Sequence, residues 1–399
     1  MGGHHDALRA GEPQPAATIG GSNRARPLSP STPSDTPLEL AVVIPTFNEI
    51  DNADELLRRL QGVLAGIAWE AIFVDDDSPD GTAAKLQALS RRWPQVRCLR
   101  RIGRRGLSSA CTEGMLSTGA PLLAVMDADL QHDEALLPQM VQALRDPAVD
   151  LVVASRYMQG GGVGQWDATR RSISARATQL SQRLLRLALS DPLSGFFMIR
   201  KTAFESTVYR LSGMGFKLLL DILASAPTPL RVKELPYTFR PRHAGDSKLD
   251  NKVAWDYLML LADKTIGRWV PTRLVSFGAI GSFGVLVHLA VLRLSLAVAG
   301  VDFVHAQTVA VTVAMVGNFF LNNALTYRDQ QLRGWAVLRG LLVFMLACGI
   351  GAVANVGVAA YIHGGWGNWL VSGLAGILVG TVWNYGATAY LVWLKPRRR

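Results

Sequence analysis

Long stretches without a charged residue dominate the last third of the chain. No Asp, Glu, Lys or Arg occurs over residues 274–292, 303–327 or 340–394 of the 399-residue sequence. A helix that crosses a bilayer needs roughly 20 apolar residues, and the turn-like "HGGWGNW" at 363–369 divides the last stretch in two. The pattern predicts four transmembrane helices, near 274–299, 304–327, 338–361 and 368–394.

Basic residues flank these helices on one side. Arg268 and Arg273 precede the first helix, three arginines lie between the second and third, and "KPRRR" follows the fourth. Positive residues stay on the cytoplasmic side, so both termini and the N-terminal portion are expected in the cytosol, at the plasma membrane if the source is prokaryotic. Residues 270–399 carry nine Lys or Arg and two Asp, which is +7 of the net charge of +10. The basic balance therefore indicates anionic lipid headgroups and no nucleic acid as the partner.

Two segments outside the helices have distinct compositions. Residues 1–37 are rich in Gly, Pro, Ser and Ala, which predicts a disordered tail, and they lack the apolar core of a signal peptide. Residues 249–271 are amphipathic, with aromatic residues among basic ones, as in a helix lying in the membrane interface; an ordinary linking helix is the alternative. The three cysteines, Cys98, Cys111 and Cys348, are isolated, which argues against disulfides and zinc.

Residues 38–248 alternate between strand and helix patterns. Strand-like "LELAVVIPTFNE", "WEAIFVDDDSPDGT", "PQVRCLRRI" and "PLLAVMDAD" are separated by helical spacing, including helices at 82–92 and about 108–118. This alternation predicts an α/β fold with a mostly parallel sheet. Ligands bind beyond the carboxyl ends of such strands, where "PTFNE", "DDDSPDG" and "DADLQ" fall. These three acidic loops are expected to form one site.

The "DADLQHDE" segment is suited to a divalent cation. Asp127 and Asp129 point to the same side of an extended chain, and hard cations such as Mg²⁺ or Mn²⁺ prefer oxygen ligands together with substrate phosphates. Gln131 adds an amide oxygen. Capping of a helix that starts near 133 is the structural alternative, and it suits Asp133 but not Asp127.

A basic group follows in the sequence. An arginine guanidinium can donate two parallel hydrogen bonds to the oxygens of one phosphate. Nearby glycines let a loop pass close to a ligand or move as a lid. At least half of the group are expected to be ordinary surface cations. Its members are Arg156, Arg170, Arg171, Arg176, Arg240, Arg242 and Lys248. Acidic loops facing phosphate-binding cations beside a membrane domain indicate a phosphorylated donor and a lipid phosphate acceptor.

Six segments carry a specific resemblance: "VVIPTFNE", "VDDDSPDGT", "VMDADLQH", "ASRYMQGGG", "DPLSGFFMIRK" and "YTFRPRHAGDSKL". Through them, residues 40–248 resemble the family 2 glycosyltransferases of GT-A fold, specifically the polyprenol (dolichol) phosphate mannosyltransferases. Residues 272–394 are similar to the four-helix GtrA-type membrane domain, through "GAIGSFGVLVHLAV", "VGNFFLNNALTY" and "GTVWNY". The resemblance implies a GT-A domain over 38–248 and a GtrA-like domain over 272–399.

The resemblance also implies roles on the donor side. Asp127, Ala128 and Asp129 would hold the metal and the nucleotide diphosphate, with Gln131 as a further ligand. Phe47 stands where the family often has Tyr, so a hydroxyl contact is lost but the stacking surface remains. The positions that would hold the base and ribose are Pro45, Phe47, Glu49 and Asp76.

The acceptor side is assigned in the same way. Arg156, Arg170 and Ser174 would grip the lipid phosphate, together with Lys248. Arg242 would neutralise the leaving diphosphate. Asp129, Arg242, Arg156 and Arg170 are accordingly the predicted catalytic residues, and the motif beside the sugar comprises Asp191, Ser194 and Gly195.

The predicted reaction transfers mannose from GDP-mannose to a polyprenyl (dolichyl) phosphate. The second pKa of a phosphate monoester is about 6, so the acceptor is already a nucleophile at neutral pH and needs no protein base. One direct displacement inverts the anomeric centre and gives a β-linked product. UDP-glucose or another nucleotide sugar is the first alternative; a GtrA-type flippase or scaffold and a processive polysaccharide synthase are the others.

The membrane helices carry polar residues whose purpose the sequence leaves open. Several asparagines, among them Asn318 and Asn384, lie within the predicted spans. Intramembrane polar residues are often functional, yet Asn also joins helices to one another. "MVGNFFLNNALTY" resembles "GTVWNYGATAYLV", which suggests a two-helix unit used twice. Anchoring beside the lipid pool and flipping the product are both compatible with this pattern.

Overall fold

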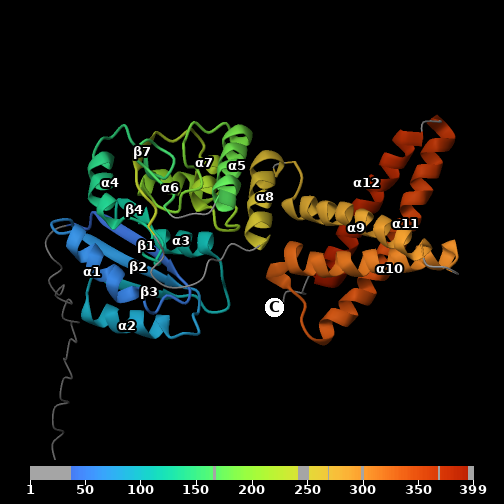
Figure 1. Ribbon diagram of the computed structural model, residues 1–399, viewed down its shortest axis with the longest axis horizontal. Helices are drawn as coiled ribbons and strands as arrows, with labels where there is room; N and C mark the ends of the chain where they lie inside the picture. Colours follow the sequence, from blue (N-terminus) through green and yellow to red (C-terminus); the bar gives the residue numbers. More distant parts are fainter. Residues whose placement is uncertain are drawn as a thin grey trace, which may run out of the picture. The chain divides into compact units, whose positions relative to one another are not determined.

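The computed structural model describes residues 37–164, 168–240, 251–267, 269–297, 301–366 and 369–393 (Figure 1). Residues 1–36 of the predicted disordered tail lie outside the described residues, as do Arg242 and Lys248.

A seven-stranded sheet forms the centre of the N-terminal region, in the order β3-β2-β1-β4-β6-β5-β7. β1 is parallel to β2 and β4, β2 to β3, and β5 to β7, whereas β6 is antiparallel to both of its neighbours. The mostly parallel sheet predicted from the alternating pattern is thereby confirmed. The strands are β1 (Leu40–Thr46), β2 (Trp69–Asp75), β3 (Val96–Arg100), β4 (Leu122–Val125), β5 (Leu151–Ser155), β6 (Phe197–Arg200) and β7 (Val232–Pro236).

Helices cover both faces of this sheet (Figure 1). Successive strand residues point to opposite faces: Val42 and Ile44 of β1 pack in one core with α1 and α4, and Val43 packs in the other with α3 and α7. Burial on both faces explains why β1 and β2 are continuous apolar runs. The helices are α1 (Ala53–Val63), α2 (Thr82–Arg92), α3 (Leu107–Leu116), α4 (Leu137–Leu144), α5 (Ala168–Leu185), α6 (Lys201–Val208) and α7 (Leu218–Ser225).

Helix α8 (Asn251–Ile266) follows the sheet region and packs on it. Leu260 and Leu261 are buried in a cluster with Leu193 and Leu220, and the Tyr257 hydroxyl donates a hydrogen bond to the Ala177 carbonyl of α5, at 2.6 Å. This face of α8 is therefore part of the protein core. The interfacial location expected for 249–271 stays a prediction.

Four long helices follow, at the positions that the charge-free stretches predict. They are α9 (Thr272–Leu296), α10 (Phe303–Leu321), α11 (Trp335–Trp366) and α12 (Trp369–Thr388). Within the described residues, three segments are long and apolar enough to cross a membrane: Thr272–Leu296, His305–Thr326 and Trp335–Asn355. A fourth crossing by α12 stays a prediction.

The membrane region is built from two similar hairpins. α10 ends in a π-helical turn (Asn322–Thr326), and α12 ends in another (Ala389–Trp393). A Cβ added at Gly284 of α9 would overlap the Asn318 amide of α10, and one added at Gly351 of α11 would overlap the Asn384 amide of α12. Each hairpin thus has a glycine facing an asparagine, which supports the two-helix repeat seen in the sequence.

Candidate active site

The three acidic loops lie at one edge of the sheet, as predicted. β1, β2 and β4 are adjacent and parallel, and Thr46 at the end of β1 is paired with Asp75 at the end of β2. The Asp76 N–H donates to the Thr46 carbonyl at 3.1 Å, and the Met126 N–H after β4 donates to the Val43 carbonyl at 3.2 Å. Residues that follow these three strands therefore share one rim.

Each of the three loops at this rim contains one residue with a strained backbone conformation. Asn48, Asp77 and Leu130 have φ values of 59°, 58° and 61°, in the left-handed region that non-glycine residues rarely adopt. One such residue follows each of β1, β2 and β4. Backbone strain of this kind concentrates at functional sites, and here it accompanies the loops that carry the predicted site residues.

The residues predicted to hold the nucleotide lie at the end of β1 and on the loops after β1 and β2. The Phe47 ring is covered by the Arg105 guanidinium, 4.5 Å from its centroid, and Glu49 accepts a hydrogen bond from the Asn52 amide at 2.8 Å. Pro45 lies within β1, between Ile44 and Thr46. These positions lie within five residues of one another at the end of β1, and their contacts with a nucleotide stay a prediction.

Asp76 directly follows β2 and is buried. Its carboxylate accepts from the Arg101 guanidinium at 2.8 Å and from the Gly106 N–H at 2.7 Å. Burial raises the pKa of Asp76, while the Gly106 hydrogen bond and the charge of Arg101 oppose that rise. The contacts hold the loop after β3 against the loop after β2.

The predicted metal motif forms a tight turn after β4. Asp129, Ala128 and Gln131 are buried, whereas the Asp127 side chain is 35% exposed. Asp129 accepts from the Gln131 N–H at 3.2 Å. The Asp127 N–H donates to Nδ1 of the buried His132, whose ring stacks on Phe196 with centroids 5.1 Å apart.

The same turn is joined to the end of the sheet region. The Gln131 amide donates to the Arg240 carbonyl at 3.0 Å, and the Arg240 guanidinium pairs with Asp133 and Glu134 at 2.6 and 2.8 Å. Arg240 is thus bound to carboxylates. Asp133 also caps the 3₁₀ turn Glu134–Leu136 by accepting from the Ala135 N–H, as the capping alternative predicts.

Two carboxylates and one amide make up the possible metal site. Within the described residues, no group of three or more His, Cys, Asp or Glu side chains is arranged to hold a metal ion. A magnesium-type ion that is also held by substrate phosphates needs only one or two protein carboxylates. The donor set of Asp127, Asp129 and Gln131 fits that kind of ion.

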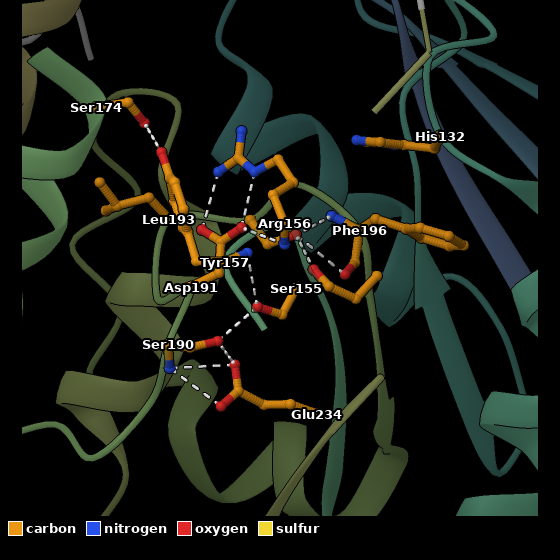
Figure 2. A network of polar contacts seen from close by, with 12 residues as sticks. His132, Ser155, Arg156, Tyr157, Ser174, Ser190, Asp191, Leu193, Phe196 and Glu234 are labelled. Carbon is orange, nitrogen blue, oxygen red and sulfur yellow. Dashed lines mark hydrogen bonds and ion pairs between the residues drawn. The ribbon is translucent and has the colours of Figure 1, made fainter. Parts of the chain in front are cut away.

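Arg156 and Asp191 form the second half of the site (Figure 2). The Asp191 carboxylate accepts from Nε of Arg156 at 2.7 Å, from Nη2 at 2.9 Å and from the Arg156 N–H at 3.2 Å. Although burial opposes the charge, the hydrogen bonds and charge of Asp191 raise the pKa of Arg156. The geometry of the pair is fixed by two parallel hydrogen bonds.

The turn that carries Asp191 reaches the metal motif. The Ser194 N–H donates to the Asp191 carbonyl at 3.2 Å, and the Ser194 hydroxyl donates to the Ala154 carbonyl at 2.8 Å. A Cβ added at Gly195 would lie 3.5 Å from Oδ2 of Asp127. The predicted sugar motif is therefore brought against the predicted metal motif.

Helix α5 brings two further predicted residues. Ser174 accepts a hydrogen bond from the Tyr157 hydroxyl at 2.7 Å, so it is joined to the loop of Arg156 (Figure 2). Arg170 lies one turn earlier on α5, where its charge acts on Lys217. Arg171 and Arg176 on the same helix are exposed, as expected for the surface members of the basic group.

Three residues of this region were not predicted as site residues: His132, Tyr157 and Lys217. His132 lies directly after the metal motif, and Tyr157 lies beside Arg156. Lys217 donates to the Leu193 carbonyl at 3.4 Å. Its signal in the sequence is "GMGFK", in which Gly213 and Gly215 adopt φ of 62° and 70°.

Family models match both regions of the chain. The family model described as glycosyl transferase family 2 matches residues 41–208, and the model described as the GtrA/DPMS transmembrane domain matches 276–393. Crystal structures of glucosyl-3-phosphoglycerate synthase from Mycobacterium tuberculosis, one with Mn²⁺ and UDP, align over 57% of this chain and 80% of theirs, at 16% identity and a TM-score of 0.44.

Two relatives named dolichol-phosphate mannosyltransferase match more of the sequence. The one from Pyrococcus furiosus is 34% identical over 358 residues, covering 89% of this chain and 99% of the relative. The one from Saccharomyces cerevisiae is 36% identical over 249 residues, covering 60% of this chain and 92% of the relative. The chain belongs to the dolichol-phosphate mannosyltransferase family, with a family 2 glycosyltransferase domain of GT-A type followed by a GtrA-type membrane domain.

Proposed function

We propose that the chain transfers mannose from GDP-mannose to a polyprenyl phosphate and yields polyprenyl phosphate β-mannose. The observation that carries this proposal is the approach of two loops: the turn of Asp191 and Gly195, which holds Arg156, meets the loop of Asp127 and Asp129. A carboxylate-rich half suits a nucleotide diphosphate with its metal, and a cationic half suits a second phosphate. The names of the relatives support mannose and a dolichyl phosphate.

Asp127, Asp129 and Gln131 would hold Mg²⁺ or Mn²⁺ together with the donor diphosphate. The ion would neutralise charge that develops on the leaving diphosphate. Leu130, with its left-handed backbone, forms the turn between Asp129 and Gln131. His132 and Gln131 fix that turn through the Asp127 N–H and the Arg240 carbonyl. The carboxylates are thereby held in place before the donor binds.

The nucleotide would lie against Phe47 and the loops after β1 and β2. The Phe47 ring offers a stacking surface, which Arg105 covers in this structure. Glu49 and Asp76 would set the position of the base and ribose. Arg242 would act at the leaving diphosphate, and its position lies outside the described residues.

The acceptor phosphate would bind at Arg156, Arg170 and Ser174. Asp191 orients the Arg156 guanidinium through two hydrogen bonds. Because the Tyr157 hydroxyl donates to Ser174, the Ser174 hydroxyl proton is directed to another acceptor, such as a phosphate oxygen. Lys248 would join this group from outside the described residues.

In this reaction the protein has to position the two substrates and stabilise the charge that develops. A phosphate monoester with its second pKa at about 6 is largely dianionic at neutral pH, so no side chain has to remove a proton. The buried Arg156–Asp191 pair and the rigid turn before Gly195 would hold the attacking phosphate in line with the sugar–diphosphate bond. A single displacement of this kind inverts the anomeric carbon.

The membrane region would place the reaction at the cytoplasmic face. The basic residues lie in the segments before α9, between α10 and α11, and after α12, which is the pattern of cytoplasmic loops. The proposed organisation is a tail over 1–37, a catalytic domain over 38–248, an interfacial helix over 249–271 and a four-helix membrane domain over 272–399.

The stereochemistry of the product tests the proposed displacement. Purified protein in detergent is incubated with GDP-mannose, polyprenyl phosphate and Mg²⁺, and the anomeric configuration of the lipid-linked mannose is determined by NMR. The proposal predicts a β-linkage from the α-linked donor. An α-linked product would contradict a single in-line displacement at this site.

A further inference from the structure

Lys217 lies where the two halves of the candidate site meet. Its ammonium group donates a long hydrogen bond, at 3.4 Å, to the carbonyl of Leu193. Leu193 belongs to the turn between Asp191 and Gly195, and Figure 2 shows it in the same cluster as the Arg156–Asp191 pair. The charges of Asp127, Asp191, Arg156 and Arg170 all act on this ammonium group. It therefore lies within electrostatic reach of both the predicted metal motif and the predicted acceptor residues.

Among the described residues, no carboxylate pairs with the ammonium group of Lys217. Across the described ranges, Lys217 forms no ion pair, and its long bond to Leu193 is its one hydrogen bond. Desolvation, followed by the charge of Arg156, lowers the pKa of Lys217 to about 8. Lys217 is partly buried. Desolvating a cation without a partner is unfavourable, and side chains with perturbed pKa values cluster at functional sites.

The loop that carries Lys217 is fixed at its start by hydrogen bonds to α7. The buried Asp221 of α7 accepts from the N–H groups of Ser212 and Gly213 at 2.9 and 3.1 Å. Lys264 of α8 pairs with the same carboxylate at 2.7 Å. These contacts fix the start of the loop to two helices.

The middle of the loop is fixed as well. The Gly215 carbonyl accepts from the Ser108 hydroxyl at 2.9 Å, and a Cβ added at Gly215 would lie 3.0 Å from Cβ of Asp256 on α8. Gly215 has φ of 70°, which disfavours any side chain. Lys217 thus projects from a rigid loop, which suits a residue that must hold a ligand in one position.

The charges around Lys217 indicate which kind of ligand it binds. Arg156 and Asp191 neutralise each other, so the pair supplies direction to a dianionic phosphate but little net positive charge. Lys217 lies beside the pair and brings a positive charge that forms no ion pair with a described carboxylate. We propose that the Lys217 ammonium binds the phosphate of the acceptor lipid, adjacent to Arg156 and Arg170. This inference rests on the proposed polyprenyl phosphate acceptor and adds a phosphate-binding residue to it.

Direct binding measurements test the role of Lys217. Full-length wild type, Lys217→Met and Lys217→Arg, each in detergent micelles, are titrated with a short-chain polyprenyl phosphate and, separately, with GDP and Mg²⁺. Loss of a charged hydrogen bond predicts that Lys217→Met raises the Kd for the lipid phosphate about 10- to 100-fold, with the Kd for GDP unchanged. Lys217→Arg keeps the charge and should recover part of the lipid affinity.

Lys201→Met is the matched control. Lys201 also donates to a main-chain carbonyl, that of Thr118 at 2.6 Å, but it lies at the start of α6, near the amino end of β4. This variant should bind the lipid like the wild type.

Two outcomes would overturn the inference: unchanged lipid binding by a folded Lys217→Met variant, or weakened GDP binding with lipid binding intact. The readout needs no turnover. If the wild type binds the lipid but fails to use GDP-mannose, the proposed donor is wrong, and the binding data still decide the role of Lys217.

Discussion

Arg156 and Asp191 form a buried, bidentate ion pair, with Nε–Oδ2 and Nη2–Oδ1 distances of 2.7 and 2.9 Å. The two residues are 35 positions apart in the sequence, and the Asp191 side chain is fully buried. The pair connects the loop after β5 to the turn that reaches the metal motif. Its integrity should determine both the stability of the domain and the orientation of the acceptor phosphate.

Replacing Asp191 with Asn should therefore affect stability and turnover together. Breaking a buried ion pair on one side costs about 3–5 kcal/mol, and misplacing a substrate can reduce the rate about 100-fold. Thermal unfolding and steady-state transfer rates measure the two effects. Asp150→Asn is the matched control, because Asp150 forms the same bidentate contact with the exposed Arg231, and exposed pairs contribute little. Equal effects of the two variants would argue against a special role for the buried pair.

Asp129→Ala should nearly abolish transfer while leaving the fold intact. The Asp129 carboxylate accepts a hydrogen bond from the Gln131 N–H two residues on, a local contact within the turn, so its main contribution is expected at the metal. Chelation of divalent ions with EDTA should have the same effect on the wild type, and Mg²⁺ or Mn²⁺ should restore the rate. Retention of most of the rate by a folded Asp129→Ala protein would refute the metal assignment.

Gly114→Ala tests the close packing of α3 on the sheet. A Cβ at Gly114 would lie 2.5 Å from Cγ1 of Val43 and 2.9 Å from Cγ2 of Val74. Overpacking of this kind costs about 1–3 kcal/mol. Gly62 of α1 has nothing within 4 Å of its added Cβ, so Gly62→Ala should be neutral or stabilising by about 0.5–1 kcal/mol. Chemical denaturation of both variants gives the comparison, and a neutral Gly114→Ala would contradict the close contact of α3 with β1 and β2.

Gly284→Ala tests the hairpin packing in the membrane region. Its methyl group would overlap the Asn318 amide, so the thermal stability in detergent should fall, whereas Gly281→Ala has open space around its Cβ and should not change it. Adding Asn318→Ala to Gly284→Ala removes the overlap and should restore stability. Additive losses in the double variant would show that the two residues do not contact each other.

The sequence was sufficient to predict that the loops after β1, β2 and β4 lie at one edge of the sheet. Their strands are apolar runs that end in acids, and parallel strands put such ends at one edge. The charge-free stretches likewise predicted the positions of α9 to α12. Asp133 as a cap and the paired hairpins were also visible as patterns, because capping and repetition are local or periodic signals.

The contacts made by the second half of the site were not predictable in the same way. The Arg156–Asp191 and Tyr157–Ser174 contacts join loops across the fold, and no local pattern encodes such pairing. β6 has only four residues, too few for its antiparallel direction to be evident. Lys217 lies in a glycine-containing loop without periodicity, and its position depends on Asp221 and α8, which only the folded chain brings together.

The most direct test of mannosyl transfer to the lipid phosphate is an assay with two donors. Labelled GDP-mannose and labelled UDP-glucose are given separately to the purified protein, with polyprenyl phosphate and Mg²⁺. The lipid fraction is then extracted and its label counted. We expect label in the lipid from GDP-mannose alone. Label from UDP-glucose in place of GDP-mannose would contradict the donor, and no label from either would contradict transfer to the lipid itself.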